Sequence, residues 1–227
     1  MAIFAISDLH LSFSVDKPMD IFKGWTDYTE RLKENIEKSV GENDTIVMPG
    51  DISWGLKLSE TIEDFRFINN LPGKKIIGKG NHDLWWESLT KMNRIMNENG
   101  FDTISFLHNN CYEVEDIAVC GSRGWFFDDT AEKKIILREA GRLELSIKAA
   151  LETKKEPVLF LHYPPISKDA VCEEIMDVIL KYNIKNVYYG HIHKACAYKA
   201  FNGEYKGVNF KCISCDLMNF EPLLIKS

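Results

Sequence analysis

The chain has 227 residues, of which 45% are hydrophobic and 27% charged, and its formal net charge is −6. This length suits one domain with a buried core, so we expect residues 1–227 to form a single domain. The acidic balance and the lack of a long Lys/Arg run argue against duplex nucleic acid as a partner, because such binding depends on clustered basic residues. A small phosphorylated substrate is compatible with both features.

The first half of the chain alternates predicted strands and helices. Strands are expected at Ala2–Ile6, Thr45–Met48 and Lys75–Ile77, and helices at Asp27–Val40, Glu60–Asn70 and Trp85–Asn99. This alternation indicates parallel pairing of the strands. The N-terminal stretch MAIFAIS is interpreted as the first strand rather than a signal peptide, and no stretch approaches the length of a membrane span. We therefore expect a cytoplasmic protein with no membrane partner.

The second half contains more short strands. They are expected near Thr103–Leu107, Cys111–Val114, Ile117–Cys120, Val158–His162 and Asn186–Tyr189, with further strands toward the C-terminus. Helices are expected over Ala131–Lys154, where apolar residues recur at helical spacing, and over Ala170–Tyr182. Runs of short strands indicate antiparallel or mixed pairing. The fold class predicted from the whole pattern is a layered α/β sandwich.

The six cysteines lie in apolar or strand-like surroundings. Cys212 and Cys215 form a C-x-x-C pattern, but no second pair completes a zinc site. A redox pair is the alternative, and reduced thiols on a strand are the favoured interpretation.

Polar side chains follow five of the predicted strands, at the point where each strand ends. These side chains are Asp8 and His10 after the first strand, then Asp51, Asn81, His162, His191 and His193 after the others. The carboxyl ends of strands are where open α/β sheets bind ligands. We therefore expect the set to converge on one site. His108 falls outside this pattern and is expected in a loop.

The inventory of donors points to metal ions. Carboxylate and imidazole ligands together suit Mn, Fe, Zn or Co rather than Ca²⁺ or Mg²⁺ alone. Seven candidates are too many for one tetrahedral ion and fit two ions, which in phosphatases and nucleases lie about 3.5–4 Å apart. A single histidine or aspartate at a strand end is more often a structural, turn or capping residue, and Asp83 could cap a helix starting near Trp85. That interpretation would have to hold independently at five strand ends.

The ordered motifs D-x-H at Asp8–His10, G-D at Gly50–Asp51, G-N-H-D at Gly80–Asp83, His162 and G-H-x-H at Gly190–His193 resemble the calcineurin-like metallophosphoesterase superfamily. The sequences GDISWG and GNHDLWW look like those of small bacterial proteins in that superfamily. These proteins are described only as predicted phosphohydrolases. The resemblance implies a four-layer α/β/β/α sandwich of two mixed sheets with a binuclear metal site at the strand ends.

Carried over position by position, the resemblance assigns each ligand to an ion. One ion is held by Asp8, His10, Asp51 and His193, and the other by Asp51, Asn81, His162 and His191, with Asp51 as the bridge. His82 binds neither ion and faces the substrate phosphate as the catalytic acid. The implied reaction is hydrolysis of a small phosphomonoester or phosphodiester by a bridging hydroxide. The expected cofactors are two divalent transition-metal ions, with Mn favoured over Fe, Zn or Co.

One departure separates this chain from many members of the superfamily. Where they have GDxxDR, this chain reads GDISWG, with Trp54 and Gly55 in place of the Asp and Arg. A protein-phosphatase function is therefore disfavoured, and the group that orients His82 is open. Arg123 is a candidate phosphate contact, with a surface turn residue as the alternative. For the tryptophans near the motifs, core packing is favoured over a substrate pocket: Trp54, Trp85, Trp86 and Trp125.

Two other functions are compatible with these motifs. One is a nuclease acting on single-stranded nucleic acid, and the other is a non-catalytic binding module on the same fold. The sequence leaves the substrate, the native metals, the oligomeric state and the biological role open.

Overall fold

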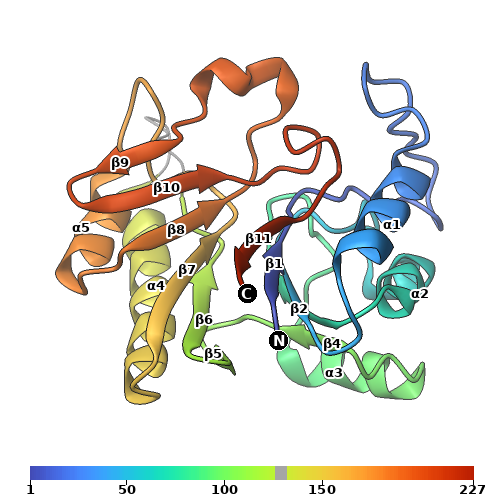
Figure 1. Ribbon diagram of the computed structural model, residues 1–227, viewed down its shortest axis with the longest axis horizontal. Coiled ribbons are helices and arrows are strands. Elements are labelled where there is room, and N and C mark those ends of the chain that lie inside the picture. The colour runs from blue at the N-terminus through green and yellow to red at the C-terminus, as the bar shows by residue number, and fades with distance from the viewer. Residues whose placement is uncertain (126–131) are drawn as a thin grey trace.

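The computed structural model describes residues 1–125 and 132–227. Two mixed sheets form its centre (Figure 1). The five-stranded sheet runs in the order β11 (Leu223–Lys226), β1 (Ile3–Ala5), β2 (Thr45–Pro49), β3 (Lys74–Gly78) and β4 (Ile104–Phe106). The six-stranded sheet runs in the order β5 (Cys111–Val114), β6 (Ile117–Ser122), β7 (Glu156–Leu161), β8 (Asn186–Tyr189), β10 (Val208–Cys212) and β9 (Gly203–Tyr205).

The inner strands are parallel, and the antiparallel strands lie at the edges. β1, β2, β3 and β4 pair in parallel, as do β6, β7, β8 and β10. β11, β5 and β9 pair antiparallel with their neighbours. Inner strands such as β2 are buried along their whole length, which explains their unbroken apolar sequence. The predicted mixed sheets are confirmed.

Helices cover the outer face of each sheet (Figure 1). The five-stranded sheet packs against α1 (Tyr28–Ser39), α2 (Ile62–Asn70) and α3 (Leu89–Glu98). The six-stranded sheet packs against α4 (Lys133–Glu152) and α5 (Glu173–Lys181). Two short 3₁₀ helices lie in the connections, η1 (Leu58–Glu60) and η2 (Lys194–Lys199). Among the described residues no helix is long and apolar enough to cross a membrane.

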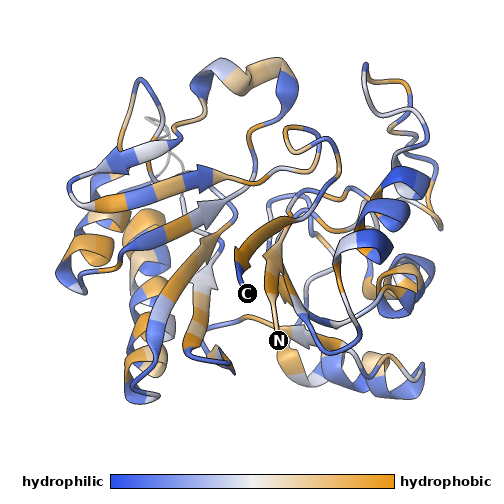
Figure 2. Cartoon of the chain, in the orientation of Figure 1, coloured by the Kyte–Doolittle hydropathy of each residue, from blue (hydrophilic) through white to orange (hydrophobic). Residues whose placement is uncertain are grey.

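The inner faces of the two sheets pack on each other. Their shared core is apolar and includes Ile3, Val47, Val119, Val158 and Phe160. The orange strands at the centre of Figure 2 mark this concentration of hydrophobic residues. Two further apolar clusters lie between each sheet and its helices. The resulting order of layers is helix, sheet, sheet, helix, which is the predicted four-layer sandwich.

Two helices differ from their predicted bounds. α3 begins at Leu89, four residues after the predicted Trp85, because Ser88 accepts the Lys91 N–H and caps the helix there. Trp85 instead lies in the core with 1% exposure. In α4 the predicted start at Ala131 lies outside the described residues. At its other end Leu151 is 42% exposed, although it is one of the apolar residues that recur at helical spacing in the predicted helix.

The structure also tests the predictions for His108, the cysteines and the tryptophans. His108 lies in the loop after β4, as predicted. All six cysteines are free, and Cys212 and Cys215 are buried without forming a disulfide. Trp85 and Trp86 pack in the core as expected, although Trp86 also borders a cavity. Trp54 is only half-buried and lines a different cavity; both cavities are described below.

Candidate metal centre

The sheets meet at the carboxyl ends of their parallel strands. Just beyond β1, Ser7 forms a bridge with Ser214, which follows β10, and the Ser7 N–H donates to the Ile213 carbonyl at 3.0 Å. The loops after β1, β2, β3, β7 and β8 all begin at this edge. These loops carry all seven side chains that the sequence analysis selected as metal ligands.

A first group of possible ligands consists of Asp8, His10 and His193, whose donor atoms lie within 4.8 Å of one another. The Nε2 atoms of His10 and His193 face each other at 3.1 Å, and His193 Nε2 lies 3.8 Å from an Asp8 oxygen. His10 and His193 are 183 positions apart in the chain and come from different sheets. Their proximity is therefore a product of the packing of the two sheets.

A second group consists of Asp51, His162 and His191, again with donor atoms within 4.8 Å. His162 Nε2 lies 2.7 Å from the Asn81 Oδ1 atom and 3.5 Å from Asp51 Oδ1. Asn81 thereby joins this group, as the sequence analysis expected. His162 and Asp51 are almost completely buried, so their donor atoms face each other rather than solvent.

Asp51 lies between the two groups. Its Oδ1 atom is 3.5 Å from His162 Nε2 of the second group, and its Oδ2 atom is 3.7 Å from His10 Nε2 of the first. Oδ1 also accepts the backbone N–H of His82 at 2.8 Å. One carboxylate oxygen thus faces each group, which is the placement that a bridging ligand requires.

The backbone around the site adopts conformations that side chains rarely permit. Four of the candidate ligands have positive φ values: Asp8 (63°), His10 (48°), Asp51 (52°) and His191 (69°). Non-glycine residues in this left-handed region carry a cost in free energy and cluster at functional sites. Successive short turns at the strand ends, held by surrounding structure, aim these side chains inward.

Two glycines allow the loops to approach each other. A Cβ atom at Gly80 would collide with the Asp51 carboxylate, and one at Gly190 would collide with Ser7 and the Asp8 carboxylate. Asp8 uses that space to accept the His191 N–H at 3.0 Å. The glycines of G-N-H-D and G-H-x-H therefore serve close packing of one ligand-bearing loop on another.

The chemistry of the donors fits divalent transition-metal ions. Burial lowers the pKa of His10 well below its usual value, that of His162 to about 3 and that of His191 to about 4. Neutral rings keep a lone pair available to an ion. The Nδ1 atoms of His10 and His162 are buried without a hydrogen-bond partner in residues 1–125 and 132–227. Imidazoles, carboxylates and an amide oxygen together match the ligand preferences of Mn, Fe, Zn and Co.

Asp216 adjoins the first ligand group and was not selected by the sequence analysis. Its Oδ1 atom lies 3.2 Å from His193 Nδ1, and its Oδ2 atom accepts the Lys194 N–H at 2.8 Å. Burial lowers the pKa of His193, but the Asp216 hydrogen bond and the Asp8 charge outweigh burial and raise it. A carboxylate that holds the outer nitrogen of a metal-binding histidine fixes the orientation of the ring. The residue follows Cys215 in an otherwise apolar strand exit, which was its only local signal.

The role of Asp83 differs from the predicted one. Rather than capping a helix, its buried carboxylate accepts hydrogen bonds from five donors in two loops, namely the N–H groups of Asp51, Ile52, Ser53 and Gly80 and the Trp85 indole. It therefore clamps the Asp51 loop to the loop that carries Asn81 and His82.

Replacing the Asp83 carboxylate by an amide tests this clamp. In Asp83→Asn one acceptor oxygen becomes an NH₂ group that faces backbone N–H donors, so we expect the free energy of unfolding to fall by about 1.5–3 kcal/mol. Urea unfolding of chelated protein measures the change without a contribution from metal binding. Asp102→Asn, at an exposed position, is the matched control. An Asp83→Asn midpoint equal to that of the control would contradict the clamp.

His82 lies at the mouth of the site beside two aromatic rings. Its ring centroid is 4.4 Å from that of Trp54 and 5.6 Å from that of His10. Trp54, which replaces the Asp of the GDxxD pattern, also stacks on His10 at 4.9 Å. The Trp54 indole therefore packs against His82. It stands at the position where the GDxxD pattern has a carboxylate. Packing on Trp54 and His10 limits the ring positions of His82.

A cavity of about 680 Å³ opens beside these rings. We call it the aromatic cavity; its lining includes Met19, Phe22, Trp25 and Trp54, together with His10, His82 and His193. Trp54, for which core packing was favoured over a substrate pocket, packs partly on the core and also lines this cavity. Trp25, which also lines the cavity, carried no signal in the motifs.

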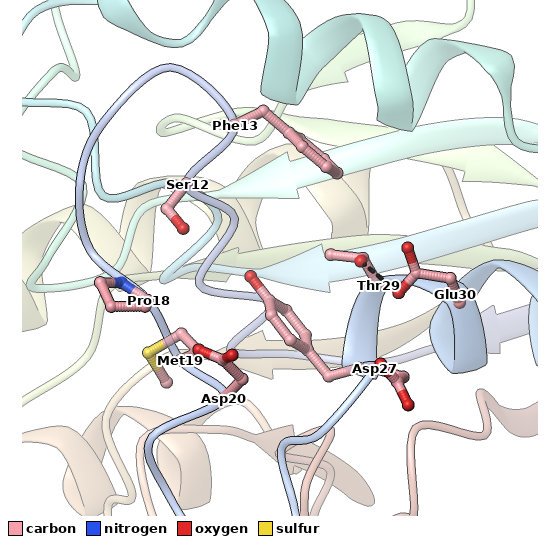
Figure 3. A pocket seen from close by; sticks show the side chains of 9 residues that line it. Ser12, Phe13, Pro18, Met19, Asp20, Asp27, Thr29 and Glu30 are labelled. Atoms are coloured by element: carbon pink, nitrogen blue, oxygen red, sulfur yellow. Dashed lines mark hydrogen bonds between the residues drawn. The ribbon is translucent and has the colours of Figure 1, made fainter.

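A smaller cavity of about 260 Å³ lies near the start of α1 (Figure 3). Ser12, Phe13 and Asp20 border it, and Thr29 donates a hydrogen bond to Glu30 at its edge (Figure 3). Tyr28 lines the same cavity and donates its hydroxyl to the His10 carbonyl at 3.0 Å. This region therefore supports the His10 turn from behind and contains none of the predicted site residues.

Arg123 is placed apart from both ligand groups. Its guanidinium lies 5.0 Å from the Trp125 ring centroid and 5.8 Å from that of Tyr163, and it lines a separate cavity. Its backbone carbonyl accepts the N–H groups of His162 at 3.2 Å and Tyr163 at 2.8 Å. Arg123 thus adjoins the metal-centre loops through its main chain, while its side chain faces another space.

Comparison with known proteins agrees with this architecture. A model of the calcineurin-like phosphoesterase family matches residues 1–195. A comparison with curated proteins found no match. Among solved structures the chain is similar to TT1561 of Thermus thermophilus, with a TM-score of 0.59 and 16% identity over 99% of this chain and 97% of that one.

Two further structures share the fold. A protein of unknown function, AQ665 from Aquifex aeolicus, has a TM-score of 0.53 and 20% identity over 98% of this chain and 95% of its own. The phosphopantetheinyl hydrolase PptH from Mycobacterium tuberculosis has a TM-score of 0.53 and 14% identity over 99% and 95%. At these identities the likeness concerns the fold, whereas the family model covers most of the sequence. The chain therefore belongs to the calcineurin-like phosphoesterase family.

Proposed function

We propose that this protein is a metal-dependent phosphoesterase that hydrolyses a small phosphomonoester or phosphodiester at a centre of two divalent ions. The observation that carries the proposal is the placement of Asp51, with one oxygen toward each of two ligand groups and with His82 on the adjoining loop. We also propose that residues 1–227 act as one domain and that the protein is cytoplasmic.

The residues assigned to each ion follow from the two groups. Asp8, His10, Asp51 and His193 would hold one ion, and Asp51, Asn81, His162 and His191 the other. Among Mn, Fe, Zn and Co we favour Mn. Bound in pairs, such ions acidify a water molecule and offset the charge of phosphoryl oxygens. Asp83 and Asp216 keep the ligand loops and the His193 ring in place.

The remaining site residues act on the substrate. His82 is the proposed proton donor to the departing oxygen, because it lies beside both ligand groups and its ring borders the aromatic cavity. That cavity, with Met19, Trp25 and Trp54 in its wall, suits an organic alcohol with an apolar portion. The similar fold named as a phosphopantetheinyl hydrolase gives one phosphodiester to include in a substrate panel.

Metal content is the primary test. Protein purified without chelator should contain up to two transition-metal ions per chain by elemental analysis, and nitrophenyl phosphate or bis-nitrophenyl phosphate hydrolysis should stop on chelation and return with Mn²⁺. The two groups of ligands are the physical reason. If the reconstituted protein binds no ion tightly, the enzymatic proposal is wrong. A non-catalytic binding module is then the favoured function. Turnover confined to single-stranded oligonucleotides would instead favour the nuclease.

A further inference from the structure

A third cavity adjoins the loop after β3, which also carries Asn81 and His82. Its volume is about 370 Å³, and it is bordered by the loop after β3, the loop after β4, the end of β6 and helix α4. We call it the basic cavity, because its charged lining consists of Lys79, Arg123, Arg138, Glu139 and Arg142, with His108 beside them. None of these residues belongs to either metal-ligand group.

The described residues that line the basic cavity carry an excess of positive charge. Glu139 is buried at 3% exposure, and its carboxylate is occupied by Arg142 at 3.3 Å and by the Gly124 N–H at 3.2 Å. Within residues 1–125 and 132–227, the other three cations, Lys79, Arg123 and Arg138, form no ion pair. Among the described residues, four cations and one carboxylate therefore line one cavity, in a protein whose net charge is −6. A bound anion would relieve their mutual repulsion.

Arg123 contributes a hydrogen-bonding reason as well as a charge. Its Nε atom is buried and has no hydrogen-bond partner in the described part of the chain. The rings of Trp125 and Tyr163 lie against the guanidinium, with centroids at 5.0 and 5.8 Å. A guanidinium packed beside aromatic rings loses little further freedom on binding, and its parallel N–H groups match the oxygens of a tetrahedral oxyanion. A phosphate in the cavity would supply the acceptor that the described residues do not.

The basic cavity is connected to the metal centre through two segments. Lys79 is followed directly by Gly80 and Asn81 on the loop after β3. The Arg123 carbonyl accepts the N–H of His162, whose ring lies in the second ligand group. Neighbouring residues of the same loops therefore point one set of side chains toward the ligand groups and another set toward this cavity.

We propose that the basic cavity binds a phosphate group of a small molecule at a site separate from the metal centre. The phosphate has two possible sources, a second phosphate carried by the substrate or a free phosphate ligand. Both present the same tetrahedral dianion to Arg123, Arg138 and Lys79. Binding at this site does not depend on catalysis, so it can be measured without metal ions.

Calorimetric titration of the whole chain with inorganic phosphate, at ionic strength held constant with chloride, tests the proposal. Chelated wild-type protein should bind one phosphate per chain. Arg123→Gln and Arg138→Gln should each weaken binding about tenfold, the effect of losing one charge-assisted hydrogen bond. Arg138 is exposed on α4, so its variant is expected to fold even where Arg123→Gln is unstable. Arg66→Gln, which removes the same charge from an exposed position on α2, should bind phosphate as wild type does.

The metal-loaded protein then separates the two sources. KM values for adenosine 5′-monophosphate and adenosine 3′,5′-bisphosphate are compared in wild type and Arg138→Gln. A rise confined to the bisphosphate assigns the site to a second substrate phosphate, and unchanged KM values with weakened calorimetric binding assign it to a free phosphate. Chelated wild-type protein that binds no phosphate, or an Arg66→Gln loss equal to that of Arg138→Gln, would overturn the proposal.

Discussion

Asp51→Ala should abolish turnover and remove most of the metal-induced rise in melting temperature. Asp51 places one oxygen 3.7 Å from His10 Nε2 and the other 3.5 Å from His162 Nε2, so its loss affects both ligand groups. An ion at one hundred times its dissociation constant stabilises the folded protein by about 2.7 kcal/mol. At about 2–4 °C per kcal/mol for a chain of this size, two such ions raise the melting temperature by about 10–20 °C.

The comparison is made within each variant, between chelated and Mn²⁺-loaded protein. This difference cancels the cost of leaving the His82 N–H without its Asp51 acceptor. His193→Ala is the matched control, because His193 belongs to the first group only. This variant should retain the part of the melting-temperature rise that the second ion causes. If Asp51→Ala keeps the full wild-type rise, Asp51 is not the bridging ligand. If the metal-induced rise in melting temperature of His193→Ala is as small as that of Asp51→Ala, the two ions bind as one unit.

His82→Ala should retain its metal ions while its turnover falls by roughly 10²–10⁴, the usual contribution of a positioned general acid. The ring of His82 packs on Trp54 at the edge of the aromatic cavity and belongs to neither ligand group. Its backbone N–H, which binds the Asp51 carboxylate, is unchanged in the variant. Removing the ring therefore leaves the bridge in place and takes away only the side-chain chemistry.

The leaving group decides the size of this loss. A nitrophenolate departs readily without a proton, whereas an alkoxide does not, so the variant should be damaged far less on nitrophenyl esters than on alkyl phosphoesters. Because Trp54 stands where a carboxylate partner would be, we expect the wild-type enzyme also to favour activated esters. Metal analysis and rates on both ester types measure these effects. Equal losses on the two esters would make His82 a phosphate-binding residue, and a lost ion would make it a ligand.

The secondary structure was largely predictable because it depends on local sequence. Continuous apolar runs identified the buried parallel strands, such as β2, which was predicted at Thr45–Met48, and helical periodicity identified α4. The prediction failed at the start of α3, where Trp85 and Trp86 belong to the core instead of a helix. There, packing of two large side chains outweighed the helix-start signal of Asp83, whose carboxylate binds across to the Asp51 loop.

The candidate ligands were visible in the sequence because parallel strands place their carboxyl ends on one edge. Each short motif marks a strand exit, so the order of Asp8, Asp51, Asn81, His162 and His191 along the chain could be turned into a common location. What the motifs did not contain was the support behind the ligands. Asp216 reaches His193 across 23 positions, and Asp83 reaches Asp51 across 32.

Only the tertiary structure decided which distant segments meet. The aromatic cavity joins Trp25 and Trp54 to the loop after β8, and the basic cavity joins α4 to the loops after β3, β4 and β6. No local sequence pattern encodes these long-range contacts, because they depend on the order of the strands and on how the two sheets and their helices pack. The sequence alone determined the strand ends, their donor atoms and the family. The packing of the layers decided what surrounds those atoms, and therefore which substrates the site can admit.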